Sequence, residues 1–172
     1  MTNKDFFIST WQSEMQSTLN AIKALPPDTD KWIYKCDEKA RSASDILGHM
    51  LPHAEVMTNA TETFIADEHT KPHHFVNTED TVAYFEKWAN AAIEKLTAMD
   101  EATWNEKTID FNVDGSTYYQ MPMNKLCWML MFDIIHHRGQ LSTYYRHMGV
   151  RNPNIYGPTA EDIEAMMAAE KN

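Results

Sequence analysis

The chain has few of the residues that interrupt helices or cross-link loops. It contains only five glycines and two cysteines in 172 residues. Cys36 and Cys127 lie far apart and form no CxxC pair, so the sequence indicates neither a dithiol redox motif nor a cysteine-ligated zinc site. We interpret both as free thiols in a reducing compartment, with Cys127 as a small core residue.

Long apolar runs are also absent. No stretch approaches the roughly 18 apolar residues of a membrane-spanning helix, so we expect no membrane association. The first residues lack the basic region and the apolar segment of a secretory signal. These two absences predict a cytoplasmic protein.

Positive charge is scarce, with 15 Lys and Arg against 25 Asp and Glu and a formal net charge of −10. Nucleic-acid binding needs clustered basic side chains that displace counterions. The densest basic group, Lys35, Lys39 and Arg41, is interrupted by Asp37 and Glu38. We therefore expect no nucleic-acid partner.

Apolar residues, which make up 43% of the chain, recur at helical spacing. The first helical face consists of Phe7, Trp11, Met15, Leu19 and Ile22, and Pro26-Pro27 ends it. A second helix opens at Ser42, where Asp45 stands in the position of a capping box, and runs to Phe64. Pro52 lies inside this segment and is expected to bend or break it.

Two further helical patterns cover residues 78–99 and 122–149, and Thr159 caps a short final helix. The polar stretch 67–77 is interpreted as a loop. The pattern fails between residues 100 and 120, where Val113-Asp-Gly-Ser indicates a turn. The sequence therefore predicts one all-α domain over residues 1–172, a four-helix bundle with a short C-terminal helix.

The 122–149 segment carries two candidate metal ligands. Asp133 and His137 are four residues apart and therefore share one face of a helix. That face also carries apolar residues, and a carboxylate there is costly unless it is paired or bound to a metal. An imidazole one turn away can share the ion, as in metal sites of helical bundles. The alternative is a hydrogen-bonded Asp–His pair without metal.

The second helix offers histidines that can face this pair. His49 lies on its expected buried side, and His53 follows one turn later. Pro52 distorts the turn between them. Either histidine could reach across the bundle core, and a pair at this spacing can also bind metal alone; we assign His53 to substrate contact or to orienting the ligands.

Several motifs together resemble a known family. His136-His137-Arg138-Gly139-Gln140-Leu141-Ser142, followed by Tyr145-Arg146 and Gly149, is similar to the signature of the DinB/YfiT-like proteins, named after DNA damage-inducible protein DinB. Pro153-Asn-Ile-Tyr-Gly-Pro158 resembles the tail of one branch. Lys39-Ala-Arg-Ser42 before Leu47-Gly-His49 is similar to the opening of the family's second helix.

This resemblance implies a four-helix bundle, often dimeric, with a metal held by one histidine of the second helix and two of the fourth. His49 matches the first of these and His137 the last, whereas Asp133 stands at the middle position. We expect His49, Asp133 and His137 to bind a divalent metal ion. Zinc or nickel is favoured, and iron or manganese is the alternative. Such a set leaves open positions for water or substrate.

The resemblance also implies a metal-dependent enzyme acting on small molecules. The two candidate activities are a thiol-dependent S-transferase, with a low-molecular-weight thiol as one substrate, and a hydrolase. The alternative is a non-catalytic metal-binding or stress-response homodimer with a vestigial site. No catalytic acid or base is identified from the sequence.

Three residues near His137 are candidates to support the site. His136 points about 100° away from His137 on an ideal helix and is expected to orient the ligands or to lie at an interface. Gln140 and Tyr144 share the face of His137 and are expected to line the mouth of the site. Gly139 inside a helix suggests close approach of another helix or of a partner subunit.

Overall fold

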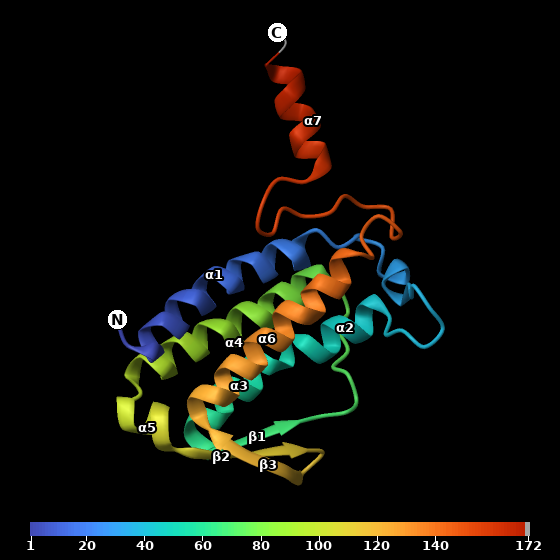
Figure 1. Cartoon of the computed structure of the whole chain (residues 1–172). Coiled ribbons are helices and arrows are strands. Elements are labelled where there is room, and N and C mark those ends of the chain that lie inside the picture. Colours follow the sequence, from blue (N-terminus) through green and yellow to red (C-terminus); the bar gives the residue numbers. More distant parts are fainter. Residues whose placement is uncertain (171–172) are drawn as a thin grey trace.

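The computed structural model describes residues 1–170 and consists of long helices with a small sheet at one end (Figure 1). The long helices are α1 (Asn3–Lys23), α4 (Thr78–Ala98) and α6 (Met123–Ser142), with α2 (Ala43–Met50) and α3 (Pro52–Thr63) in series. The shorter elements are η1 (Thr29–Ile33), β1 (Ile65–Glu68), α5 (Glu101–Glu106), β2 (Thr108–Val113), β3 (Ser116–Pro122) and α7 (Ala160–Ala169).

Helices α2 and α7 begin at the capping residues that the sequence indicates, Ser42 and Thr159, and α1 begins at a further one, Thr2. Thr2, Ser42 and Thr159 each form a capping box with an aspartate three residues later. The apolar face of α1 is buried against α4 and α6, and the Trp11 indole donates a hydrogen bond to the Ala89 carbonyl of α4. Burial of these apolar faces holds the long helices together.

Pro52 divides the second helical segment, as expected. It occupies the first turn of α3, where its missing N–H leaves no intrahelical hydrogen bond unmade. His49 therefore lies in the last turn of α2 and His53 in the first turn of α3, and their rings meet edge to face with centroids 5.0 Å apart. The break keeps the two histidines side by side.

The prediction of an all-α fold is wrong, because the chain also forms a three-stranded mixed sheet. Its strand order is β1-β2-β3, with β1 parallel to β2 and β2 antiparallel to β3. Asp114 and Gly115 both have positive φ, 47° and 76°, which is the backbone of a two-residue hairpin turn. The expected turn at 113–116 thus connects two strands, and β1 takes the start of the segment that was expected to be a loop.

The fourth helical segment is shorter than expected. α6 ends at Ser142, and residues 143–148 form successive turns instead of continuing the helix to Gly149. Near its end the Arg138 side chain, only 1% exposed, contacts the Glu14 carboxylate of α1 at 2.5 Å and donates to the Thr18 hydroxyl at 3.0 Å. Arg138 also hydrogen-bonds the Tyr156 hydroxyl, which ties the following coil to the bundle.

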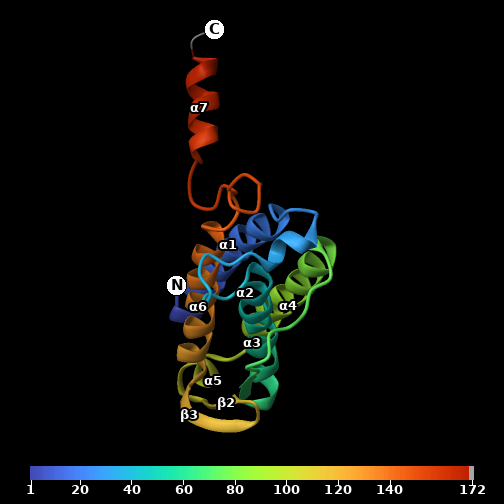
Figure 2. The same cartoon turned by 90° about the vertical axis from the view of Figure 1, so that its right-hand side faces the viewer.

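α7 stands away from the other helices at the end opposite the sheet, as two views agree (Figures 1 and 2). None of its residues is buried. Arg146 and Arg151 form ion pairs with Glu161 and Asp162 at its start. Within residues 1–170, no helix combines the length and the apolar character that crossing a membrane requires.

Gly48 and Gly139 differ in what surrounds them. A Cβ on Gly48 would come within 2.1 Å of the His73 carbonyl oxygen, whereas a Cβ on Gly139 would meet no described atom within 4 Å. Among residues 1–170 no other helix therefore approaches Gly139, contrary to that part of the expectation.

Alanine substitutions at these two glycines are predicted to have opposite effects. Gly48→Ala should lower the free energy of unfolding by about 1–3 kcal/mol through overpacking. Gly139→Ala should raise it by about 0.5–1 kcal/mol because alanine loses less backbone freedom. Urea unfolding of both variants checks this pair. A destabilised Gly139→Ala protein would instead indicate a partner subunit packed at that position.

Candidate metal centre

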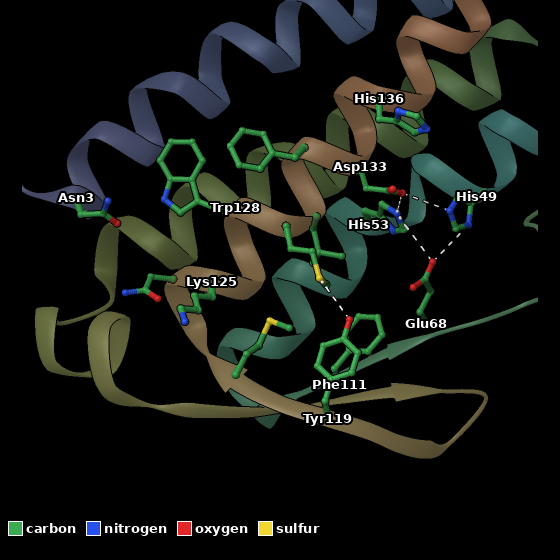
Figure 3. Close-up of a pocket in the computed structure, with 15 residues that line it drawn as sticks. Asn3, His49, His53, Glu68, Phe111, Tyr119, Lys125, Trp128, Asp133 and His136 are labelled. Carbon is green, nitrogen blue, oxygen red and sulfur yellow. Dashed lines mark hydrogen bonds and ion pairs between the residues drawn. The ribbon is translucent and has the colours of Figure 1, made fainter.

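The candidate site lies between α6 and the α2–α3 junction. α6 presents Asp133 and His137 one turn apart, and the junction presents His49 and His53 from the other side. Figure 3 shows Asp133, His49 and His53 pointing toward one another, with Glu68 of β1 below them. Local helix geometry thus explains each pair, and packing of the helices brings the two pairs together.

Three imidazoles converge on one oxygen of the Asp133 carboxylate. The Nε2 atom of His53 lies 2.6 Å from Asp133 Oδ2, that of His49 lies 3.3 Å from it, and that of His137 lies 3.4 Å from it. The His49 and His137 rings are themselves in edge-to-face contact, with centroids 4.7 Å apart. The structure therefore brings together the three residues expected to bind metal and adds His53 to them.

The surroundings keep the Asp133 carboxylate ionised. Partial burial raises the pKa of Asp133, but hydrogen bonds from His49 and His53 outweigh it and hold the pKa far below its usual range. Burial lowers the pKa of His137, against the opposing influence of Gln140 and Asp133. A carboxylate anion beside an imidazole that favours its neutral form is the protonation state in which both side chains bind metals.

Polar contacts at the far side of the rings, a hydrogen bond for His137 and an ion pair for His49, distinguish the histidines. His137 Nδ1 lies 2.8 Å from Gln140 Oε1, and His49 Nδ1 lies 3.4 Å from Glu68 Oε1. Histidine ligands of metals usually donate their second N–H to such an oxygen, which fixes the ring and leaves the other nitrogen free. His53 has no such partner, because its Nδ1 is buried without a hydrogen bond among the described residues.

The donor set fits a divalent metal ion. His49, His53 and Asp133 form a candidate metal-binding triad, whose ligand atoms all lie within 4.8 Å of one another. A tetrahedral ion with bonds of about 2.0–2.1 Å separates neighbouring ligand atoms by about 3.3–3.4 Å. The His49–Asp133 and His137–Asp133 distances, 3.3 Å and 3.4 Å, have this spacing, whereas His53 at 2.6 Å makes a direct hydrogen bond to the carboxylate.

The residues expected to support the site lie on two sides of it. His136 is exposed beside His137, and its Nε2 lies 2.9 Å from Gln140 Nε2. Tyr144 is buried, and its hydroxyl donates to the Arg41 carbonyl at 3.1 Å and lies 3.3 Å from Cys36 Sγ. Burial and the Cys36 contact raise the pKa of Tyr144 to about 12, so its hydroxyl stays neutral near pH 7.

Glu68 is the site residue that sequence reasoning missed. It lies in β1, a strand of four residues whose hydrogen-bonding partner is about 45 positions away, and no local pattern marks it as part of a site. The one available signal was an acidic residue two positions after the apolar Ala66, and acidic residues are common on surfaces.

Two cavities meet at the cluster. The larger, about 1090 Å³, is lined by His49, His53, Glu68 and Asp133 at one end and by aromatic residues of α6 and the hairpin at the other. The second, about 740 Å³, is lined by His137, Gln140, Tyr144, Cys36 and Arg41. His136 lines both. The candidate ligands are therefore reachable from two sides.

Gln140 provides a test of how the His137 ring is held. Gln140→Leu removes the oxygen that fixes the ring and should weaken zinc binding by about 10–100-fold. Gln16→Leu, on the exposed part of α1, serves as the matched control and should change nothing. Competition titrations with a chromophoric chelator measure both affinities. Equal affinities would show that Gln140 does not orient a metal ligand.

Comparisons with known proteins agree on one family. The family model of the DinB family matches residues 1–171. An uncharacterized protein of Bacillus subtilis, YrdA, is 24% identical over 159 residues, covering 92% of this chain and 90% of that protein. Crystal structures of two DinB-like proteins have the same fold at 20% identity. YjoA of B. subtilis has a TM-score of 0.65, and the match covers 89% of this chain and 99% of YjoA. The Bacillus cereus protein has a TM-score of 0.69, and the match covers 87% of this chain and 95% of that protein. The chain belongs to the DinB family.

Proposed function

We propose that this DinB-family protein binds one divalent metal ion through His49, Asp133 and His137, with His53 hydrogen-bonded to the same carboxylate. The observation that carries the proposal is the convergence of three imidazole nitrogens on Asp133 Oδ2 at 2.6–3.4 Å. The oriented second nitrogens of His49 and His137 favour these two histidines over His53 as ligands. Zinc or nickel suits two imidazoles and a carboxylate, and iron or manganese is the alternative.

We further propose that the site is that of a metal-dependent enzyme acting on small molecules. A divalent ion supplies Lewis acidity, which lowers the pKa of a water or thiol bound to it. The protein contributes the orientation of the ligands through Glu68 and Gln140 and the neutral hydroxyl of Tyr144, which faces the second cavity.

The two cavities support a transferase rather than a hydrolase. One is lined by Asp133, His49 and His53 and the other by His137, and they share only His136 among their lining residues. Two separate molecules can therefore approach the ion at once, as transfer of a thiol to a second substrate requires, whereas hydrolysis needs only water beside one substrate. We propose the smaller cavity, which Arg41 lines, as the place of a low-molecular-weight thiol.

Metal analysis of the untagged protein tests the proposal. After zinc, nickel or manganese is offered and excess metal removed, we expect one ion per chain in the wild type and none in His137→Ala. His53→Ala should retain the ion with affinity reduced about 10–100-fold. If the wild type binds no stoichiometric metal, the proposal is wrong. If His137→Ala retains the full amount of metal, the third ligand is His53 instead of His137. A thiol-transfer assay with several thiols and an electrophilic acceptor follows.

A non-catalytic role is the second candidate. The direct 2.6 Å hydrogen bond between His53 Nε2 and Asp133 Oδ2 gives the partly buried carboxylate a partner within the protein, which is also compatible with a stress-response protein whose site is vestigial. We propose a cytoplasmic homodimer in either case. Stoichiometric metal without turnover of any thiol or ester substrate, together with a dimer in sedimentation velocity, would favour this second candidate.

A further inference from the structure

The larger cavity has an ordered wall that points to a particular class of ligand. Along one face of α6 its lining residues are Lys125, Trp128, Met129, Phe132, Asp133 and His136, at the spacings of successive helical turns. A cation therefore stands at one end of this stripe, aromatic rings in the middle and the candidate metal ligands at the other end (Figure 3). Lys125 and Asp133 are separated by about 12 Å along the helix axis.

The opposite wall of the cavity is also apolar. Phe111 of β2 and Tyr119 of β3 stack with centroids 4.9 Å apart, and the Tyr119 hydroxyl contacts Met129 Sδ of α6 at 3.5 Å. Phe132 remains 57% exposed and Tyr119 45% exposed in the chain alone. Exposed aromatic side chains gathered around one cavity usually mark a binding site.

Lys125 gives the cavity a charge preference. In the part of the chain that the structure describes, its ammonium group forms no ion pair and no hydrogen bond. Lys125 is the one lysine or arginine among the residues that line this cavity, so it gives one end of an otherwise largely apolar wall a positive charge. An anionic group of a ligand would pair with it.

We propose that this cavity binds an elongated, largely apolar small molecule that carries an anionic group at one end and a metal-binding group at the other. The anion pairs with Lys125, the apolar body lies between the α6 stripe and the β2–β3 hairpin, and the metal-binding end reaches Asp133 and His49. The metal-binding end rests on the proposed function, whereas the Lys125 end and the apolar middle do not depend on it.

Three hydroxamates test the proposal on the zinc-loaded protein by calorimetric titration. Acetohydroxamate carries only the metal-binding group, octanohydroxamate adds an apolar chain, and suberate monohydroxamate adds a terminal carboxylate. We expect octanohydroxamate to bind at least about tenfold more tightly than acetohydroxamate. Lys125→Gln should weaken suberate monohydroxamate alone by about three- to fivefold. Lys71→Gln, at another exposed lysine, is the matched control and should weaken none of them.

A fluorescent probe separates failure of this inference from failure of the metal site. Anilinonaphthalene sulfonate, an aromatic anion without a metal-binding group, should bind the metal-free protein with one site. Lys125→Gln and Phe132→Ser should each weaken that binding. If zinc fails to bind but the probe behaves in this way, the proposed function is lost and the apolar anion site stands.

Three outcomes overturn the inference. The first is an octanohydroxamate affinity equal to that of acetohydroxamate, and the second is an equal loss for both long ligands in Lys125→Gln. The third is a dimer in sedimentation velocity that Phe132→Ser dissociates, combined with no binding of the fluorescent probe. That third result would assign the aromatic stripe to an interface between two copies of the chain.

Discussion

Asp133→Asn is expected to bind zinc at least about 100-fold more weakly than the wild type. The variant keeps the shape of the side chain but removes the negative charge on which three imidazoles converge. Metal content after dialysis and competition titration with a chromophoric chelator measure the loss. The amide oxygen can still accept a hydrogen bond from His53, so the fold should survive.

Two further variants complete this test. Asp133→His places a third histidine at the position where the resemblance to DinB/YfiT-like proteins implies one, and it should keep the metal. Glu106→Gln, exposed on α5, removes one negative charge elsewhere and controls for the change in net charge. Wild-type zinc affinity in Asp133→Asn would show that Asp133 is not a metal ligand, and the site would need to be assigned to the histidines alone.

Arg138→Ala is expected to lower the free energy of unfolding by about 3–5 kcal/mol, which is typical of breaking a buried ion pair by removing one partner. The Arg138 side chain is 1% exposed and that of its partner Glu14 is 13% exposed. Alanine leaves the Glu14 carboxylate nearly buried without its cation and frees the coil that Tyr156 ties to the bundle. Urea-induced unfolding followed by circular dichroism gives the change.

The double variant Arg138→Met with Glu14→Leu separates the ion pair from simple packing. Replacing both partners with apolar side chains removes the uncompensated charge, so most of the loss should be recovered. If the double variant is as unstable as Arg138→Ala, the arginine stabilises the protein mainly through its packing and its bond to Thr18. A loss below about 1 kcal/mol in Arg138→Ala would show that Glu14 is solvated in solution.

Local patterns predicted the helices because each helix carries its own signals. Capping residues such as Ser42 and Thr159 and the apolar face of α1 are visible within a few residues, and they mark the starts of helices in the structure. The sheet escaped prediction because β3 is exposed along most of its length and shows no alternation of buried and exposed residues. β1 is too short to show any period.

The candidate site was predictable only where its residues share a helix. The helical period predicts that Asp133 and His137 lie together and that His49 lies on the buried side of its own helix, and the family resemblance joins the three in one site. His53 was placed outside the expected ligands because Pro52 seemed to disturb the turn, yet the break at Leu51 and Pro52 keeps its ring beside His49. Glu68 depends on strand pairing between distant segments, which no periodicity reveals.

The parallel pairing of β1 with β2 makes completion of the site a late event in folding. Ile65 pairs with Asp110, so the pairing closes a loop of about 45 residues that contains the whole of α4. Helices form from local contacts and such closures are slow, and the contact between His53 and Asp133 spans a still longer separation of 80 residues, so the site assembles after the individual helices have formed. Pulse-labelling hydrogen exchange during refolding should show amides of α1 and α6 protected before those of Ala66 and Glu68. During synthesis Glu68 and its strand partner Val113 emerge before Asp133 and His137, so the site is completed only when α6, made last of the site's elements, packs against the α2–α3 junction.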